Sequence, residues 1–137
     1  MALAARNLGL TLGPFDALTD RATVARFAAA TRSAEAGVPA TFPIVWLAHP
    51  DIRAAIEGFA RPGEVAFHEE QTFDYRAPLA ADVAYRLLVN IERQEGPARL
   101  VLTSCVEREG KTTLTMRTVL RLVATAASAS AEMATTR

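Results

Sequence analysis

Hydrophobic and polar positions alternate most clearly in the second half of the chain. In residues 64–76 four of the six odd positions carry large apolar side chains and the even positions from 68 onward carry polar ones. The apolar residues are Val65, Phe67, Phe73 and Tyr75. A period of two predicts a strand with one buried face, and Pro78 ends it because proline has no amide hydrogen for a sheet. Similar patterns predict strands at 83–93, 98–107 and 111–124.

Turn and cap signals organise the rest of the chain. The loops QEGP and REGK join the last three strands, and short glycine-containing loops are typical of antiparallel hairpins. Thr19 or Asp20 can cap a helix over residues 19–31, and the spacing of Ile52 and Ile56 predicts a second, short helix. The segment TFPIVWLA between these helices is apolar throughout, so its periodicity leaves a helical turn and a short strand both open.

The order of these elements predicts an α+β fold in which an antiparallel sheet is wrapped around a central helix. Residues 1–124 are expected to form a single domain, and residues 125–137 a disordered tail because they are small and polar. The strands at 83–93 and 98–107 carry apolar residues on both faces. A strand of this kind requires cover on both sides, so we expect an oligomer, in the simplest case a dimer.

Composition excludes several classes of partner and site. Fifteen basic and fifteen acidic residues leave no net charge that would favour nucleic acid or an anionic membrane. No apolar run approaches the roughly 20 residues that span a bilayer, and the N-terminus lacks a secretory pattern, so we expect a cytoplasmic protein. Two histidines and the lone Cys105 lie far apart in the sequence, so neither a zinc site nor a cofactor is expected.

The segment FHEEQTFDYRAPLAADVAYRLLVNIERQ resembles the signature of MaoC-like dehydratases, His-Gly-Glu-Gln-x-Phe-x-(Tyr/Phe)-x-Arg-Pro-Leu-x-Ala-Gly-Asp. The matching positions are His68, Glu70, Gln71, Phe73, Tyr75, Pro78, Leu79, Ala81 and Asp82. Ala77 stands where the signature has arginine, and its glycine is replaced. Residues 12–31 and 37–46 are similar to the family's opening helix and to the start of its central helix, so the resemblance covers roughly residues 8–123.

This resemblance implies the hotdog fold, in which a sheet wraps a long central helix and two units join into a continuous sheet. It also implies binding of an acyl-CoA or acyl-carrier-protein thioester and a hydro-lyase reaction, the addition or removal of water. Catalytic members place an Asp-x-Asn-Pro-x-His motif after the first helix, where the aspartate and histidine move the proton. This chain has Arg32-Ser33-Ala34-Glu35-Ala36 there. It therefore resembles the N-terminal, non-catalytic type of hotdog, which shapes the acyl tunnel and pairs with a catalytic one.

Histidines and carboxylates are the candidate catalytic residues. His49 and Asp51 could act as a base and its orienting group, or His49 and Asp51 could instead cap the helix that begins at Pro50. His68 lies beside Glu70 on the polar face of its strand, at a family position that is not the catalytic histidine. A structural or surface pair is the alternative there, as it is for Asp74 and Arg76.

The start of the expected central helix provides the candidate substrate contacts. Thr41 and Phe42 lie where free backbone N–H groups could hold a thioester carbonyl. Trp46 and Phe42 are of the type that lines an acyl tunnel, but core packing uses the same residues.

Three functions follow from these observations. The first is an acyl-binding, non-catalytic subunit, or a degenerate homodimer, of an (R)-hydratase or 3-hydroxyacyl-thioester dehydratase system. The second is an acyl-CoA thioesterase on the same fold, with Glu57 as a possible helix carboxylate. The third is a binding module for acyl thioesters that performs no chemistry.

Overall fold

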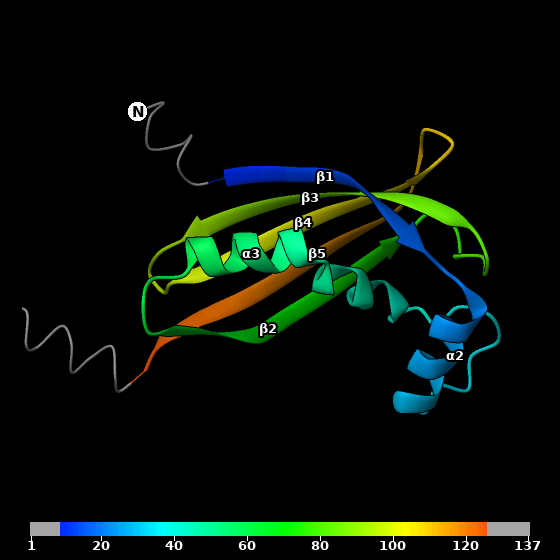
Figure 1. Ribbon diagram of the computed structural model, residues 1–137, viewed down its shortest axis with the longest axis horizontal. Helices are drawn as coiled ribbons and strands as arrows, with labels where there is room; N and C mark the ends of the chain where they lie inside the picture. Colours follow the sequence, from blue (N-terminus) through cyan, green and yellow to red (C-terminus); the bar gives the residue numbers. More distant parts are fainter. Residues whose placement is uncertain (1–8, 126–137) are drawn as a thin grey trace, which may run out of the picture.

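Five antiparallel strands form one sheet, with helical segments along one face and at one end of it (Figure 1). The computed structural model describes residues 9–125. The strands are β1 (Gly9–Leu18), β2 (Glu64–Tyr75), β3 (Ala84–Gln94), β4 (Arg99–Arg108) and β5 (Lys111–Ala124), in the order β1-β3-β4-β5-β2. The helical segments are α2 (Arg21–Ala30), η1 (Phe42–Ala48) and α3 (Pro50–Phe59). This arrangement confirms the predicted α+β class.

Each element that the sequence predicted is present at nearly its predicted bounds. The hairpins β3–β4 and β4–β5 pair antiparallel, as the glycine loops indicated. Helix α2 begins after Asp20, whose carboxylate accepts the N–H of Thr23 at 3.1 Å. This contact satisfies one of the free donors of the first helical turn, so the predicted N-cap is confirmed.

Strand β1 is an element that the sequence patterns did not predict. Its alternation breaks in the middle: Leu12 lies opposite Val89 and Phe15 lies opposite Leu87, so β1 uses one residue more than β3 over this stretch. Gly13 has φ +101°, and a Cβ atom there would lie 2.6 Å from the carbonyl oxygen of Leu87. Only glycine fits at this position of the bulge. Because of the extra residue, the apolar side chains before and after the bulge face the same side of the sheet.

The central helical region consists of two pieces instead of one long helix. Residues 42–48 form the 3-10 helix η1, which settles the ambiguity between helical turn and strand. His49 is extended, with φ −53° and ψ 134°, because the ring of Pro50 disfavours a helical conformation of the preceding residue. Helix α3 then starts with Pro50 and buries Ile52 completely against the sheet. The resemblance implied a single long helix, and Pro50 is the reason that it is interrupted.

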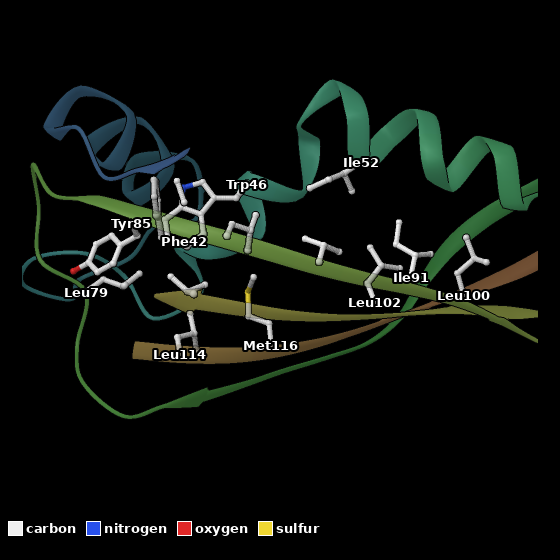
Figure 2. Packing of buried hydrophobic residues seen from close by; sticks show 14 of the residues in the cluster. Phe42, Trp46, Ile52, Leu79, Tyr85, Ile91, Leu100, Leu102, Leu114 and Met116 are labelled. Carbon is white, nitrogen blue, oxygen red and sulfur yellow. The ribbon is translucent and has the colours of Figure 1, made fainter. Parts of the chain in front are cut away.

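The core lies between the helices and the inner face of β3, β4 and β5 (Figure 2). Four of the labelled strand residues, Ile91, Leu100, Leu102 and Met116, form its floor, and all are at most 2% exposed. At one end Phe42 packs edge-to-face on Trp46, with ring centroids 6.0 Å apart. The indole Nε1 of Trp46 donates a hydrogen bond to the Leu18 carbonyl at 3.0 Å, so its polar atom is satisfied inside the core.

A bulge in β2 corrects the predicted single apolar face of this strand. His68 pairs with Leu120 and Glu70 pairs with Val119, so Glu69 is an extra residue. Phe73 and Tyr75, beyond the bulge, therefore face the core, whereas Val65 and Phe67 face outward and are 43% and 56% exposed. One inserted residue moves every following side chain to the opposite face, because the side-chain period of a strand is two.

A network of ion pairs ties the C-terminal end of α3 to the start of β2. The Arg93 guanidinium contacts both carboxylate oxygens of Glu64, at 2.8 and 3.2 Å, and one oxygen of Glu95 at 2.8 Å. It also donates to the carbonyl of Phe59, the last residue of α3, at 2.8 Å. The side chains of Arg93 and Glu64 are each only 10% exposed. This network satisfies a free carbonyl at the helix end as well as the two charges.

Most of the predicted tail, residues 126–137, lies outside the described residues. Thr125 is described, and its N–H donates to the Gly63 carbonyl at 2.9 Å. Among residues 9–125, no helix has the length and apolar character needed to cross a bilayer.

Candidate functional site

A cavity of about 350 Å³ opens between the segment that precedes η1 and the turn that follows β2. Its lining residues are Glu35, Ala36, Val38, Ala40, Tyr75, Arg76, Ala77, Pro78 and Leu79. Gly37 and Pro39 interrupt regular structure in the first segment, and Pro78 does so in the second. The end of β2 lies beside the chain entering η1 in Figure 1. The cavity therefore has two irregular walls that the sheet and the central helix hold in place.

Tyr75 joins the two walls. Its hydroxyl donates a hydrogen bond to the carbonyl of Ala40 at 2.5 Å, a contact between residues 35 positions apart. The N–H of Ala40 in turn donates to the carboxylate of Glu35 at 3.0 Å. Both backbone polar groups of Ala40 are thus held by side chains that line the cavity, which fixes the shape of the wall between Glu35 and Thr41.

Burial raises the pKa of Tyr75 to about 12, and the nearby negative charge of Glu35 adds to this shift. Both effects disfavour the phenolate, because each penalises a second negative charge at this place. At neutral pH Tyr75 is therefore a hydrogen-bond donor and neither a base nor a nucleophile.

Arg76 lines the cavity, and its guanidinium has no partner among the described residues. The backbone N–H of Arg76 donates to the Thr113 carbonyl at 2.8 Å, which continues the sheet by one residue. Its side chain makes no ion pair or hydrogen bond within residues 9–125, and neither does that of Asp74. The charge pair proposed for these two residues is therefore not formed, and Arg76 retains its full set of donors.

The depth of the cavity is apolar. Glu35 and Arg76 are exposed at its rim, Tyr75 and Val38 are half-buried, and Leu79 is only 7% exposed. Figure 2 shows Leu79 next to Tyr85 at the end of the hydrophobic cluster, and the hydroxyl of Tyr85 accepts the N–H of Ala80 at 2.9 Å. The cavity thus runs from a charged rim to the edge of the core, which is the usual polarity of a site for an amphipathic ligand.

His49 and Asp51, the first pair of predicted catalytic residues, lie at the start of α3 and not in this cavity. The Nδ1 atom of His49 accepts the backbone N–H of Asp51 at 3.1 Å, and its ring packs on that of Phe15 at a tilt of 36°, with centroids 4.2 Å apart. The contact uses the backbone of Asp51 and not its carboxylate. This is the capping arrangement, and a catalytic role for the pair stays a prediction.

His68 also lies away from the cavity. It precedes the β2 bulge, is exposed, and lies opposite Leu120. Tyr75 is seven positions further along the strand, which corresponds to roughly 20 Å at about 3.3 Å per residue. Glu70, expected beside His68, instead forms an ion pair with Arg117 on the outer face of the sheet. A catalytic role for His68 stays a prediction as well.

The predicted substrate contacts lie just behind the cavity. Thr41 is exposed at the start of η1, directly after the lining residue Ala40. Phe42 is fully buried, and its N–H already donates to the Pro39 carbonyl at 3.0 Å. Trp46 is 9% exposed and packs on Phe42. Both aromatic rings are core residues in this structure, and contact with an acyl chain stays a prediction for all three.

The sequence patterns did not identify the residues that line this cavity as a group. Glu35 was noted only as a departure from the family motif, and Arg76 only as a member of a charge pair. No local signal relates positions 35–40 to positions 75–79, because the contact between them depends on β2 pairing with β5 at the edge of the sheet. The usable signal was the pair of proline-interrupted segments, each next to a predicted element.

Solved structures with the same architecture identify the fold. A hot-dog-like protein from Thermanaerovibrio acidaminovorans superposes with a TM-score of 0.62 over 86% of this chain and 84% of that one, at 16% identity. The chain has the hotdog fold. The HadBC (3R-hydroxyacyl-ACP dehydratase) complex from Mycobacterium tuberculosis gives the same TM-score at 16% identity, covering 82% of this hotdog chain and 96% of that chain.

Two further solved structures have comparable TM-scores; one is a longer chain and the other is named as a thioesterase. HtdX from Mycobacterium tuberculosis has a TM-score of 0.62 at 21% identity. The match covers 82% of this chain but only 50% of HtdX. The fluoroacetyl-CoA thioesterase FlK has a TM-score of 0.60 at 12% identity, with 85% of each chain covered. No family model matches the sequence. No curated protein matches it either.

Proposed function

We propose that this hotdog chain is an acyl-thioester-binding subunit of an (R)-hydratase or 3-hydroxyacyl-thioester dehydratase system. In this role it shapes the acyl site and works with a catalytic hotdog, or pairs with a second copy of itself. The chemical step is then the addition of water to an enoyl thioester or its removal from a 3-hydroxyacyl thioester.

The observation that carries this proposal is the absence of an acid–base pair from the cavity lining. Residues 32–36 stand where the MaoC-like family has its catalytic aspartate and histidine. The only titratable group that this segment contributes to the lining is the Glu35 carboxylate. Neither His49 nor His68 lines the cavity. The cavity nevertheless keeps the apolar depth and charged rim that a thioester would require. Structural similarity to the HadBC dehydratase complex supports a role within a heteromer.

Binding without turnover is the test. Crotonyl-CoA is titrated into the purified chain by calorimetry, and its enoyl absorbance is followed separately. We expect heat of binding and no loss of absorbance. Hydration by the chain alone at an ordinary enzyme rate, on the order of 1–1,000 per second, would show that it is catalytic. His49→Gln and His68→Gln would then identify the base, and the absence of both signals would reject the proposal.

Thioester hydrolysis is the second candidate, because FlK matches this chain about as well as the dehydratase complex does. Release of free thiol from a panel of acyl-CoAs distinguishes the two reactions, since hydration leaves the thioester intact. We expect no thiol release above the rate without protein. Steady release would favour the thioesterase, and Glu35→Gln and Glu57→Gln would then be compared.

The free edge of β2 is the proposed subunit interface. β2 is an edge strand of twelve residues, and it displays the exposed Val65 and Phe67 next to Val123. An unpaired apolar edge favours strand addition, and the hotdog resemblance implies a sheet continuous across two subunits. We expect Phe67→Lys to weaken self-association in sedimentation experiments. Leu18→Lys, a control that is 53% exposed at the other edge strand, should have no effect. A monomer mass independent of concentration, for the chain alone and with a catalytic hotdog, would exclude this interface.

A further inference from the structure

Three exposed apolar side chains gather on the outer face of the sheet, the face that points away from the helices. Val65 lies directly opposite Val123, and Phe67 follows two positions along β2 on the same face. These are three of the five large apolar side chains that are exposed among residues 9–125. The start of β2 and the end of β5 lie side by side at the end of the sheet away from α2 (Figure 1). We call these three residues the outer patch.

The middle of the same face shows how the chain covers apolar residues without a partner. Val101 and Val119 lie opposite each other there, and both are buried. Arg117 and Arg121 flank Val119 along β5 and form ion pairs with carboxylates of β2. The aliphatic stems of such arginines shield apolar neighbours from water. The outer patch stays about half exposed, so the chain's own charged side chains do not cover it.

The subunit interface proposed at the edge of β2 does not cover the outer patch either. Strand addition at an edge uses backbone N–H and C=O groups in the plane of the sheet, whereas side chains stand roughly perpendicular to that plane. Val123 is not on an edge, because β5 pairs with β4 on one side and with β2 on the other. The outer patch therefore points to a second contact, made by the face of the sheet.

The charged residues beside the outer patch indicate which partner fits. Arg99 lies opposite Arg121 and donates its Nε to the side chain of Gln94 at 3.1 Å. Its other two guanidinium nitrogens have no partner within residues 9–125. One oxygen of Glu92 accepts the Nε2 of Gln94 at 2.9 Å, and the other oxygen has no partner in the same part of the chain. The surface thus offers a free donor and a free acceptor.

A second copy of the chain is complementary to such a surface. A two-fold contact brings the same patch of both copies together, so each group of one copy meets the opposite group of the other. This end of the face is also balanced in charge, with Arg99 and Arg121 against Glu69 and Glu92. A partner of one strong charge, such as nucleic acid, would meet repulsion from half of these groups.

We propose that the outer patch is the contact between two copies of this chain that pack back to back through their outer sheet faces. Sheets packed in this way lie about 10 Å apart, with their facing side chains interdigitated. Phe67 and Val123 form the apolar part of the contact, and Arg99 of each copy faces Glu92 of the other. Together with pairing at the β2 edge, the contact joins two dimers into an assembly of four chains. This inference goes beyond the proposed function and does not depend on acyl-thioester binding.

Sedimentation equilibrium of the full chain over a range of concentrations tests the contact. We expect the wild type to reach the mass of four chains and Val123→Lys to stop at two. The dissociation constant of the second step should rise more than tenfold, because the variant would bury a lysine charge in the contact. The substitution does not touch the edge interface, since β5 has no free edge.

Leu10→Lys is the matched control. Leu10 is 43% exposed and Val123 is 44% exposed, but Leu10 lies on β1 at the other edge of the sheet, opposite the core residue Ile91. This variant should reach four chains like the wild type. Arg99→Glu is a second test that leaves the apolar residues intact. It should weaken the second step about tenfold, because it places like charges opposite each other. Urea midpoints would show that each variant is folded.

The outcomes separate the face contact from the edge interface. If the wild type stays monomeric, or stops at two chains and Val123→Lys does the same, the outer patch is not a contact between copies and the assignment is wrong. Another occupant, residues 126–137 or a catalytic hotdog, would then have to cover it. If the wild type forms two chains and Val123→Lys is a monomer, the face contact stands and the edge interface is wrong. Binding of crotonyl-CoA is measured separately and is unaffected by either result.

Discussion

Charged residues near the two ends of β2 differ in pairing: those at its start form ion pairs, whereas those at its end do not. At its start, Glu64 is nearly buried and is held by Arg93, which also contacts Glu95 and the end of α3. At its end, Arg76 and Glu35 are exposed at the rim of the cavity and do not pair. The first arrangement uses its hydrogen-bonding capacity to join a helix to a sheet. In the second arrangement the hydrogen-bonding groups remain available to a ligand. The comparison therefore distinguishes charged residues that stabilise the fold from charged residues that can bind a ligand.

The largest expected effect is at the start of β2. Replacing Arg93 by Met leaves the nearly buried carboxylate of Glu64 without its partner and the Phe59 carbonyl without a donor. Breaking such a pair on one side should cost about 3 kcal/mol of unfolding free energy. Urea denaturation would measure this. Arg61→Met is the control, because its side chain is 69% exposed and contacts Glu95 at the surface. A loss below about 1 kcal/mol for Arg93→Met would mean that the network contributes no more than a surface pair.

The same network predicts a smaller effect of acid. The hydrogen bond from Arg93 lowers the pKa of Glu64 below its ordinary value of 4.5. The folded protein then binds this proton less tightly than the unfolded chain does. The stability from the pair is therefore complete above about pH 4.5 and is lost as pH falls through the lowered pKa. Urea midpoints at neutral and acid pH should show this loss in the wild type and less of it in Arg93→Met. Equal acid sensitivity of both proteins would assign the loss to other carboxylates.

Tyr75→Phe tests the link between the walls of the cavity. It removes the hydrogen bond to Ala40 without changing the ring, so we expect a loss of about 1 kcal/mol. It should also remove a phenolate transition near pH 12 from the absorbance titration. Because the folded-state pKa is raised, the stability linked to Tyr75 is complete below about pH 10 and declines toward pH 12. If the transition persisted in the variant, its assignment to Tyr75 would be wrong.

The sequence predicted the elements better than it predicted the faces they expose. Periodicity found four of the five strands and both α-helices because these elements keep one period over most of their length, as Leu114 and Met116 do in β5. It missed β1 and misjudged half of β2 for one shared reason. A bulge at Gly13 and another at Glu69 each insert a residue, which breaks the period of two while the strand continues.

The cavity was less predictable than the fold because it depends on tertiary contacts. The resemblance placed Tyr75 and Pro78 correctly next to a strand end, but it indicated no contact with the segment that contains Glu35 and Ala40. That contact arises when the end of β2 meets the segment before η1, 35 positions away at Ala40. Histidine can act as an acid or a base, so His49 was a candidate catalytic residue. In the structure it caps a helix. Residue type alone could not distinguish these roles.

The smallest expected effect on stability is at the end of β2. Arg76→Gln removes a charge that has no partner in the described chain, and it keeps the backbone N–H that donates to Thr113. We therefore expect a change within about 0.5 kcal/mol of unfolding free energy, as for an ordinary surface substitution. Urea denaturation of the variant beside Arg93→Met provides the direct contrast between the two ends of the strand. A loss above about 1 kcal/mol would show that Arg76 has a structural role and is not held free for a ligand. A neutral result, together with weaker binding of an acyl thioester, would assign Arg76 to the ligand and not to the fold.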